Sequence, residues 1–515
     1  MLERPGPDEL DRFAREYDFA LAPAERAQLA AIADALVAVL EKLDAQEPAA
    51  AAPLAARRDP GRPPAPGEDP YNAIVRWCRV EADAAGVLSG RAVSLKDSIA
   101  VGDVPLTCGS RALSGFVPAE DSVVAERVLR AGGVIVAMTN MDDFALSAGG
   151  ESSHYGPTLN PFDLGRTAGG SSGGAAAALH YDRVDLAIGC DQGGSIRVPS
   201  AWCGVLGLKP THSLVPYTGI VGIDATFDHA GPMARSSIDV ATLLQAIAGK
   251  DKSDPRQREV PELNFVEAVA NAPDTLEGVT VGLVEEGFSE AAGVHTTVAD
   301  AVEQAANRFA DLGARLERIA LPEHQQADGA SFATAIQGMT DLLESGGNGF
   351  GWKGRYWADL PQALGPGLRE HAADLSAQVK IYLLLGAWLR RRHSGAFYAK
   401  AQNVRPLLVD GYDRALAGVD ALLMPTTPFV AHRLGTDLPL SERVLRGWAV
   451  LVNTIPTDMT GHPALTIPAA ESDNLPVGVM LIGPRFADDR LLSLAATYER
   501  RYGWLPSRRP PTAAA

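Results

Sequence analysis

Short runs of apolar residues alternate along the chain with longer segments in which apolar residues recur every three or four positions. The short runs have the length of buried strands, and the longer segments have helical periodicity. Strands are predicted at 92–95, 133–139, 185–189, 279–284, 420–424, 464–467 and 477–482, with helices at 123–131, 298–312 and 490–502. This alternation predicts an α/β fold with a large mixed, mostly parallel sheet covered by helices.

The first 70 residues follow a different pattern. Residues 23–43 open with Pro23, which favours the first turn of a helix, and continue with one apolar helical face. The residues of that face are Leu29, Ile32, Leu36, Val39, Leu40 and Leu43. Residues 51–70 are rich in alanine, proline and arginine without periodicity, which is typical of a linker. Residues 1–70 are therefore predicted to be a helical region and a linker, with the apolar face covered by the main body or by a second subunit.

Residues 322–410 interrupt the alternation of strands and helices. They are helix-like, contain aromatic residues and include a glycine-rich stretch at 344–354. We predict an inserted helical subdomain that forms one wall of a substrate pocket. It would separate a first core segment at 71–321 from a second core segment at 411–515.

Composition and charge narrow the possible functions. The 515 residues are 46% hydrophobic and 21% charged, with a formal net charge of −17. A strongly acidic chain lacks the basic face that nucleic acids require, so we predict no nucleic-acid partner. No stretch approaches the roughly 20 apolar residues of a membrane span, so no membrane partner is predicted either. The four cysteines lack CxxC spacing and are interpreted as buried thiols, which favours a cytoplasmic protein.

Two glycine- and serine-rich loops hold the candidate chemistry. Residues 169–174 read Gly-Gly-Ser-Ser-Gly-Gly and lead into an alanine-rich helix at 175–179. Residues 191–195 read Asp-Gln-Gly-Gly-Ser and follow the strand predicted at 185–189. Backbone N–H groups in such bare loops can point at an anion or a developing oxyanion, and glycine permits close approach.

These loops admit three general interpretations. Residues 169–173 match the G-x-S-x-G nucleophile elbow, but the segment before them resembles a loop rather than a strand. A phosphate-binding P-loop needs a Gly-Lys-Ser/Thr sequence, which does not follow these glycines. A flexible turn accounts for one loop alone, but poorly for both loops together with Ser-Ile-Arg-Val-Pro-Ser at 195–200.

The two loops together resemble the signature of the amidase signature family of serine hydrolases. The resemblance extends from about Leu88 to Tyr502 and includes a lysine segment at 92–110 and a pocket loop at 139–150. Segments 460–469 and 475–492 resemble the closing strands and helix of that family. The N-terminal extension and the Asp-Gln-Gly-Gly-Ser-Ile-Arg variant are most similar to bacterial enantioselective amidases, which accept aromatic and short aliphatic amides.

The resemblance implies a catalytic triad of Ser195, Ser171 and Lys96. Ser195 would attack the amide carbonyl, Ser171 would relay the proton, and a neutral Lys96 would act as the base. Burial without a carboxylate partner keeps a lysine neutral, and Asp97 should face the other side of the strand. Ser171 is preferred to Ser172 because its offset of 24 residues from Ser195 matches the family.

The same resemblance assigns the surroundings of the triad. A cis peptide is expected between Gly170 and Ser171. The oxyanion hole would be formed by backbone N–H groups of Gln192, Gly193, Gly194 and Ser195. The implied substrate-binding residues are Ala145, Leu146, Ser147 and Ile455. Trp202 lies where phenylalanine is usual in the family, and it is predicted to narrow the space behind Ser195. Ala137-Met138 lie where many relatives carry Gly-Lys, and they are predicted to alter the loop that frames the acyl pocket.

The remaining polar residues near the loops are assigned structural roles. Ser172, Asp191 and Arg197 are interpreted as scaffold, and Cys190 and Cys203 as buried small hydrophobes. His462 is interpreted as structural, and no histidine pair has metal-binding spacing. We therefore predict no metal and no cofactor.

These observations predict hydrolysis of a carboxylic amide to a carboxylate and ammonia or an amine through an acyl-enzyme. Carbamates, ureas and anilides remain alternative substrates for the same triad. An amidotransferase subunit that passes ammonia to a charged-tRNA complex is ranked lower, and a non-enzymatic scaffold lowest. The predicted partners are a small-molecule amide and a second copy of the chain in a homodimer.

Overall fold

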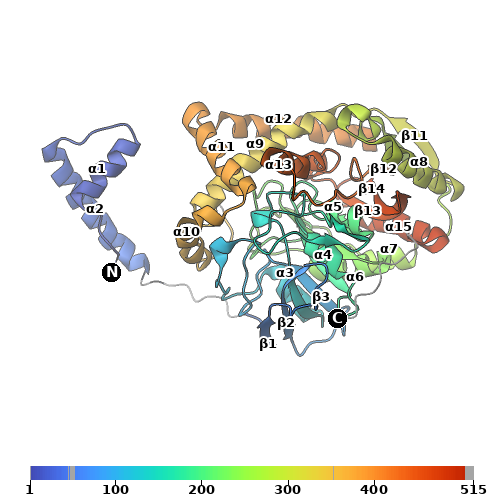
Figure 1. Cartoon of the computed structure of the whole chain (residues 1–515), viewed down its shortest axis with the longest axis horizontal. Helices are drawn as coiled ribbons and strands as arrows, with labels where there is room; N and C mark the ends of the chain where they lie inside the picture. The colour runs from blue at the N-terminus through green and yellow to red at the C-terminus, as the bar shows by residue number, and fades with distance from the viewer. Residues whose placement is uncertain (1, 45, 47–52, 352, 505–515) are drawn as a thin grey trace. The chain divides into compact units, whose positions relative to one another are not determined.

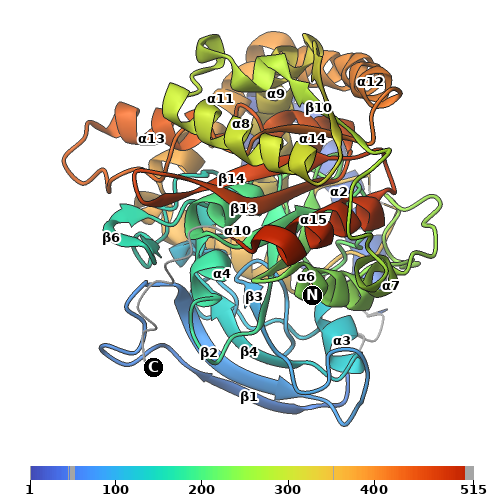
Figure 2. The same cartoon turned by 90° about the vertical axis from the view of Figure 1, so that its right-hand side faces the viewer.

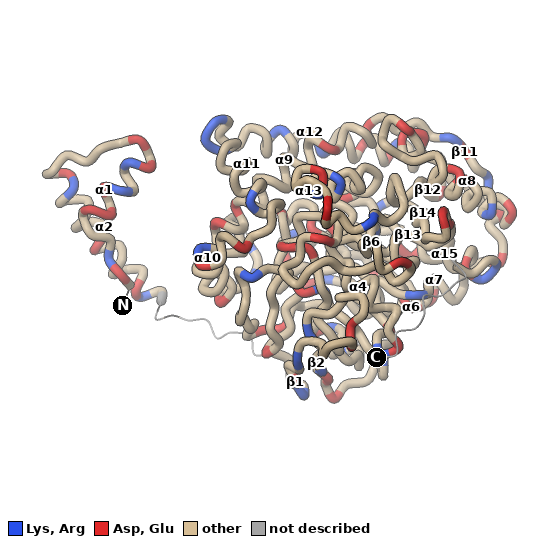
Figure 3. The backbone as a smooth tube through the Cα atoms, viewed as in Figure 1, with Lys and Arg blue, Asp and Glu red and all other residues tan. Residues whose placement is uncertain are grey.

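The protein is represented by a computed structural model (Figure 1). It describes residues 2–44, 46, 53–351 and 353–504. The chain divides into two compact units, Met1–Ala52 and Pro53–Ala515. Acidic and basic residues are interspersed along both units (Figure 3).

The first unit contains two helices, α1 (Pro7–Glu16) and α2 (Pro23–Asp44), which pack against each other. An ion pair between Arg26 and Asp11 at 2.7 Å joins them. The helix predicted at 23–43 therefore forms. Its apolar side chains are exposed, with Leu36 at 60%.

The second unit is built on a large mixed sheet, and its described residues form 12 strands in that sheet. The order across it is β1-β2-β4-β3-β7-β9-β8-β13-β14-β12-β10-β11. The strands are β1 (Arg57–Arg62), β2 (Ile74–Glu81), β3 (Ala92–Lys96), β4 (Val134–Thr139), β7 (Leu186–Asp191), β8 (Leu206–Lys209), β9 (His229–Ala234), β10 (Thr280–Val284), β11 (Arg315–Ile319), β12 (Ala421–Pro425), β13 (Ala464–Ser472) and β14 (Leu475–Ile482). A separate two-stranded sheet pairs β5 (Leu159–Asn160) with β6 (Asp163–Thr167).

The predicted α/β fold with a mixed sheet is confirmed, but the expectation of a mostly parallel sheet is wrong, because most neighbouring strands among the described residues pair antiparallel. Strands β4, β3 and β7 are parallel neighbours, as are β12, β10 and β11. The strands between these two groups pair antiparallel, from β7 through β9, β8, β13 and β14 to β12. Parallel neighbours need a long crossover, whereas β13 and β14 are joined by a tight turn, which forces antiparallel pairing.

Part of the expected linker at 51–70 is a strand. Residues 57–62 form β1, which pairs antiparallel with β2 at the edge of the sheet. Proline and glycine at 60 and 61 obscure its strand character, and an edge position tolerates both residues. The boundary between the two units accordingly lies after residue 52 rather than near residue 70.

Helices cover the sheet (Figure 2). They are α3 (Val123–Arg130), α4 (Gly173–Ala178), α5 (Arg197–Cys203), α6 (Ser237–Ile247), α7 (Phe265–Ala270), α8 (Thr296–Asp311), α13 (Leu440–Ala449), α14 (Ile455–Thr460) and α15 (Asp488–Tyr502). Helices α8 and α15 pack on β13, α6 packs on β9, and α5 packs on β13 and β14. The alanine-rich α4 is entirely buried, because small side chains let it lie directly against β3, β4 and β7.

Four further helices lie between β11 and β12, where the sequence predicted a helical insert. They are α9 (Glu323–Glu344), α10 (Leu360–Glu370), α11 (Ala377–His393) and α12 (Ala396–Leu416). Helix α9 packs against α11 and α12, and it meets the core through α14. Within the described residues, none of the helices combines the length and the apolar character required to span a bilayer.

Candidate active site

The two glycine-rich loops meet at the carboxyl ends of β3 and β7. These strands are parallel neighbours, so their carboxyl ends lie at the same edge of the sheet. Lys96 is the last residue of β3, and Ser195 lies in the loop between β7 and α5. Ser171 precedes Ser172, the N-cap residue of α4, and α4 packs on both strands. The fold therefore brings the three predicted triad residues to one place.

A hydrogen bond connects two of the three residues directly. Lys96 Nζ donates to Ser171 Oγ at 2.7 Å and to the carbonyl oxygen of Cys190 at 3.4 Å. The expected cis peptide between Gly170 and Ser171 is present. No side-chain hydrogen bond joins Ser171 to Ser195 in the described part of the chain, which leaves the Ser195 hydroxyl free to approach a substrate. All three side chains are buried, with Ser195 4% exposed.

Burial governs the charge of Lys96. Desolvation lowers the pKa of Lys96, and it outweighs the opposing attraction of Asp142 and Asp191. Asp97 turns away, as predicted, and accepts hydrogen bonds from the backbone N–H and hydroxyl of Thr107. Lys96 thus lies in an environment that favours the neutral amine, which is the form required of a base.

Ser172 has a different environment from Ser171. Its hydroxyl donates to the Cys190 carbonyl at 3.1 Å and accepts from the Cys190 N–H at 3.2 Å, while its own N–H donates to the Ser195 carbonyl at 3.1 Å. These three bonds tie the two loops together. Ser172 therefore has the contacts of a scaffold residue, whereas the hydroxyl of Ser171 accepts from Lys96.

The loop at 192–195 presents unused backbone donors. The N–H groups of these four residues make no hydrogen bond to the described parts of the protein. Gly194 has φ +142°, and an added Cβ would lie 2.2 Å from Thr454 Oγ1. The Thr454 hydroxyl also donates to the Gly193 carbonyl at 2.5 Å, which fixes the loop from the opposite side. Free N–H groups in a rigid loop beside Ser195 are the geometry that stabilises an oxyanion.

A buried ionic network holds this loop from below. Arg197 donates to Asp191 at 2.9 Å and 3.0 Å, to Asp458 at 2.7 Å and to the Thr454 carbonyl at 2.8 Å. Burial opposes the charge on Asp191, but attraction to Arg197 prevails and lowers the pKa of Asp191. Arg197 therefore anchors the start of the loop at Asp191 to the segment that contains Thr454.

A small cavity of about 40 Å³ opens beside Ser195. Its lining residues are Ala145, Leu146, Ser147, Ala148, Gln192, Gly193, Ser195, Ile223, Ser331, Phe332, Ala335, Tyr382, Trp448, Leu451 and Ile455. The four predicted substrate-binding residues, Ala145, Leu146, Ser147 and Ile455, are all among them. The Trp448 indole packs against Phe332 and Tyr382 and donates to the Leu146 carbonyl at 3.0 Å. The cavity is thus small and mostly apolar.

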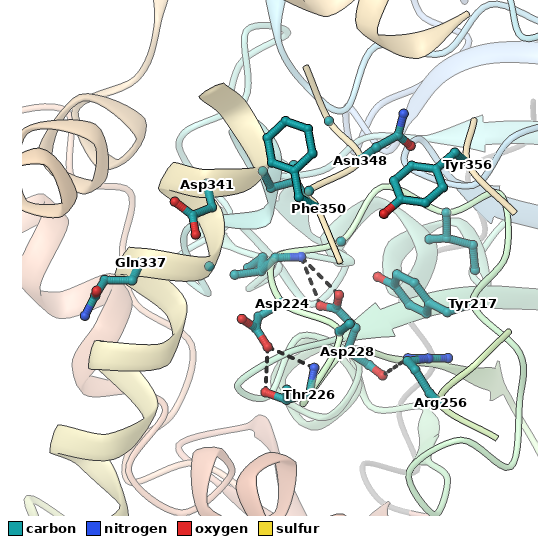
Figure 4. Close-up of a pocket in the computed structure, with 18 of the residues that line it drawn as sticks. Tyr217, Asp224, Thr226, Asp228, Arg256, Gln337, Asp341, Asn348, Phe350 and Tyr356 are labelled. Carbon is teal, nitrogen blue, oxygen red and sulfur yellow. Dashed lines mark hydrogen bonds between the residues drawn. The ribbon is translucent and has the colours of Figure 1, made fainter. Parts of the chain in front are cut away.

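A larger cavity of about 750 Å³ shares one lining residue, Ile223, with the small cavity. The segment 217–228 forms one wall, and α9, residues 347–350 and residues 355–357 contribute others (Figure 4). Within it, Asp224 accepts hydrogen bonds from the backbone and hydroxyl of Thr226. Burial raises the pKa of Asp228 to about 7.

Several residues of the site were not predicted from the sequence. Asp142 accepts three backbone N–H groups and leaves no room for a Cβ on Gly170, because such an atom would lie 1.9 Å from Asp142 Oδ2. Phe332, Trp448 and Thr454 also contact the site but come from distant segments. No local motif marks them, since each is identified only by its position in the fold.

Other sequence predictions concern residues that lie away from the cavity. Trp202 does not line it, and its indole packs against Gly169 and donates to the Phe429 carbonyl at 3.1 Å. Trp202 is therefore not a wall of this cavity, and the narrowing of the space behind Ser195 stays a prediction. His462 bonds to Asp413 at 3.0 Å and to Thr460 at 2.9 Å. Among the described residues, no group of three or more His, Cys, Asp or Glu side chains is arranged to hold a metal ion.

A comparison with protein families identifies the chain. The sequence profile of the family described as Amidase matches residues 75–492. The chain belongs to the amidase family. It is therefore an enzyme of a family that acts on C–N bonds, as the two loops predicted.

Individual relatives of this amidase-family chain include components of amidotransferases. A glutamyl-tRNA(Gln) amidotransferase subunit from Methanosarcina mazei is 34% identical over 433 residues, which cover 83% of this chain and 88% of that protein. The corresponding protein from Symbiobacterium thermophilum is 37% identical over 421 residues, covering 81% and 83%. Among solved structures, the corresponding protein from Thermotoga maritima has a TM-score of 0.71 at 29% identity, with 86% and 91% covered. Native peptide amidase of Stenotrophomonas maltophilia has a TM-score of 0.70 at 27% identity, with the same coverage.

These relatives correct the prediction about partners. The sequence favoured a homodimer that acts on a small-molecule amide without nucleic acid. The curated relatives are instead named as subunits of an amidotransferase whose name includes a tRNA. The net charge was a poor basis for predicting that no nucleic acid is involved, because the net charge of one polypeptide gives no information about the surfaces of other subunits in a complex. The finer resemblance to enantioselective amidases remains a prediction.

Proposed function

We propose that this enzyme cleaves the C–N bond of a carboxylic amide through a Ser195–Ser171–Lys96 triad and an acyl-enzyme. The observation that carries the proposal is the buried hydrogen bond from Lys96 Nζ to Ser171 Oγ, placed beside Ser195 and the free N–H groups of 192–195. A desolvated lysine supplies a base, a serine supplies a relay, and a second serine supplies a nucleophile.

The reaction follows from this arrangement. Lys96 takes a proton from Ser171 as Ser171 takes one from Ser195, and Ser195 Oγ bonds to the amide carbon. The carbonyl oxygen of the amide becomes an oxyanion, which the N–H groups of 192–195 hold. The relay then returns a proton to the nitrogen, the C–N bond breaks, and the amine or ammonia departs. Water enters by the same relay, cleaves the Ser195 ester and releases the carboxylate.

The substrate of this reaction is proposed only by class. Carbamates, ureas and anilides could use the same triad, but the small cavity beside Ser195 favours a compact group at the reacting carbon. The resemblance to enantioselective amidases would place aromatic or short aliphatic acyl groups here. All four cysteines are unpaired, which fits the cytoplasmic location that we also propose.

A second candidate is amide cleavage within an amidotransferase. The relatives named as subunits of glutamyl-tRNA(Gln) amidotransferase, each covering more than four-fifths of this chain, favour it. The chemistry at Ser195 would be the same, with the released ammonia passed to an acceptor. Release of ammonia by the purified chain alone, without partner subunits, would favour the first candidate.

The pH dependence of activity follows from the charge of Lys96. Burial lowers the pKa of Lys96 below its ordinary value of 10.5, so the neutral base is populated at lower pH than for an exposed lysine. We expect kcat/KM to rise with pH and to level off below pH 10.5. A pH–rate profile of the free enzyme measures this directly. If kcat/KM instead rises with a midpoint at or above pH 10.5, the result would contradict a desolvated lysine as the base.

Trapping with hydroxylamine tests the acyl-enzyme. Two amides with the same acyl group and different leaving amines should give one acyl-enzyme at Ser195. With added hydroxylamine, the ratio of hydroxamate to carboxylate is therefore expected to be equal for both substrates. Product analysis by mass spectrometry gives the two ratios. Ratios that differ with the leaving amine would show that no common acyl-enzyme forms.

A further inference from the structure

The side chain of Gln192 has an unused hydrogen-bond acceptor close to Ser195. Gln192 is 4% exposed and lines the same small cavity as Ser195. Its Nε2 donates to the Tyr217 hydroxyl at 2.7 Å, whereas its Oε1 is buried without a partner among the described residues. Buried polar atoms without a partner are rare in proteins, so this oxygen requires an explanation.

The orientation of the Gln192 amide is held by Tyr217. The Tyr217 N–H donates to Asp254 at 2.9 Å, and the Arg256 guanidinium lies 4.9 Å from the centre of the Tyr217 ring (Figure 4). Because Gln192 Nε2 donates to the Tyr217 hydroxyl, the amide leaves Oε1 as its free end.

Two neighbouring donors in the cavity are already engaged. The Trp448 N–H donates to the Leu146 carbonyl at 3.0 Å, and the Ser331 hydroxyl donates to the Ala327 carbonyl at 2.9 Å. Leu451, Ile455 and Ile223 contribute apolar walls. None of the described side chains donates to Oε1, and an occupant of the cavity is placed to provide a donor.

We propose that Gln192 Oε1 accepts the N–H of the scissile amide and makes the site selective for amides over esters of the same acid. The inference rests on the proposed function. Gln192 also offers a backbone N–H to the oxyanion, so its side chain begins beside the carbon that Ser195 attacks. An amide presents an N–H at that carbon, and the nitrogen keeps a hydrogen until it leaves. An ester presents an oxygen there, which would leave Oε1 without a donor.

A matched pair of substrates tests the proposal on the full chain. N-methylbutyramide and methyl butyrate have the same acyl group and nearly the same shape, and differ by N–H against O. We compare the ratio of their kcat/KM values in the wild type, Gln192→Met and Gln192→Glu. Met removes the acceptor, and we expect the amide-to-ester ratio to fall about tenfold. Glu keeps an acceptor oxygen, so we expect its ratio to stay within about threefold of the wild type.

The ratio separates recognition from general damage. Distortion of the oxyanion loop slows both substrates and leaves the ratio unchanged, so an unchanged ratio in Gln192→Met overturns the proposal. Equal falls in the Met and Glu variants overturn it as well. If Gln192→Met does not fold, Tyr217→Phe is the alternative: it frees the Gln192 amide to rotate, and the ratio is expected to fall by about threefold. A wild-type chain that forms no acyl-enzyme from either compound overturns the proposed function itself, and this inference with it.

Discussion

Replacement of Ser195 by alanine is expected to lower kcat/KM for amides by about 10⁴-fold or more, the scale of losing the nucleophile in other serine hydrolases. The physical reason is that the acyl-enzyme cannot form without Oγ, while the N–H groups of 192–195 still bind a carbonyl. A fluorophosphonate or sulfonyl fluoride probe should label the wild type at Ser195 and leave Ser195→Ala unlabelled. Steady-state kinetics and peptide mapping of the labelled protein give the two readouts.

Ser331 provides a matched control for this substitution. It is another buried serine that lines the same cavity, but its hydroxyl donates to Ala327 within its own helix. Ser331→Ala should therefore keep the label at Ser195 and most of the activity. Labelling that persists in Ser195→Ala, or moves to Ser171, would show that another serine is the nucleophile.

Replacement of Lys96 by methionine is expected to lower kcat by about 10³-fold, within the range for loss of a general base. Methionine fills a similar volume. Among the described residues, Lys96 Nζ bonds only to neutral oxygens of Ser171 and Cys190, so no carboxylate there loses an ion partner. We expect the midpoint of thermal unfolding to fall little, because the cost of burying an amine is also removed. Steady-state kinetics and thermal melts measure the two effects separately.

The second buried lysine supplies the control. Lys209 is also fully buried, and burial lowers its pKa to about 8, but its Nζ donates to the His462 carbonyl at 2.7 Å, away from the small cavity. Lys209→Met should retain acyl-enzyme formation at Ser195. Full activity in Lys96→Met, or an equal loss in both variants, would exclude Lys96 as the specific base.

The residues that meet at the site could be named from the sequence because the patterns that mark them are local. Lys96 ends a strand, and Ser171 and Ser195 lie in loops whose small side chains are visible in the sequence itself. Ser172 shows the limit of this reasoning. Sequence alone could separate it from Ser171 only by a resemblance, whereas its bonds to Cys190 and Ser195 show what it contacts.

The prediction of partners failed for a different reason. A net charge of −17 argued against a nucleic-acid partner, yet amidotransferase subunits associated by name with a tRNA are among the relatives of this chain. Charge sums over a whole chain, while recognition depends on where charges lie and on which polypeptide carries them. The relation of this chain to those subunits became evident only through comparison over most of its length.

By itself, the sequence determined the α/β class, most strands and helices, and the loops that hold Lys96, Ser171 and Ser195. Each of these depends on periodicity or on residues close together in the chain. The tertiary structure decided the antiparallel middle of the sheet, the edge strand β1 and the walls of the cavity. It also decided the hydrogen bonds from Gln192 to Tyr217 and from Thr454 to the Gly193 carbonyl. These contacts join segments separated by tens to hundreds of residues, so they depend on packing that no local pattern encodes.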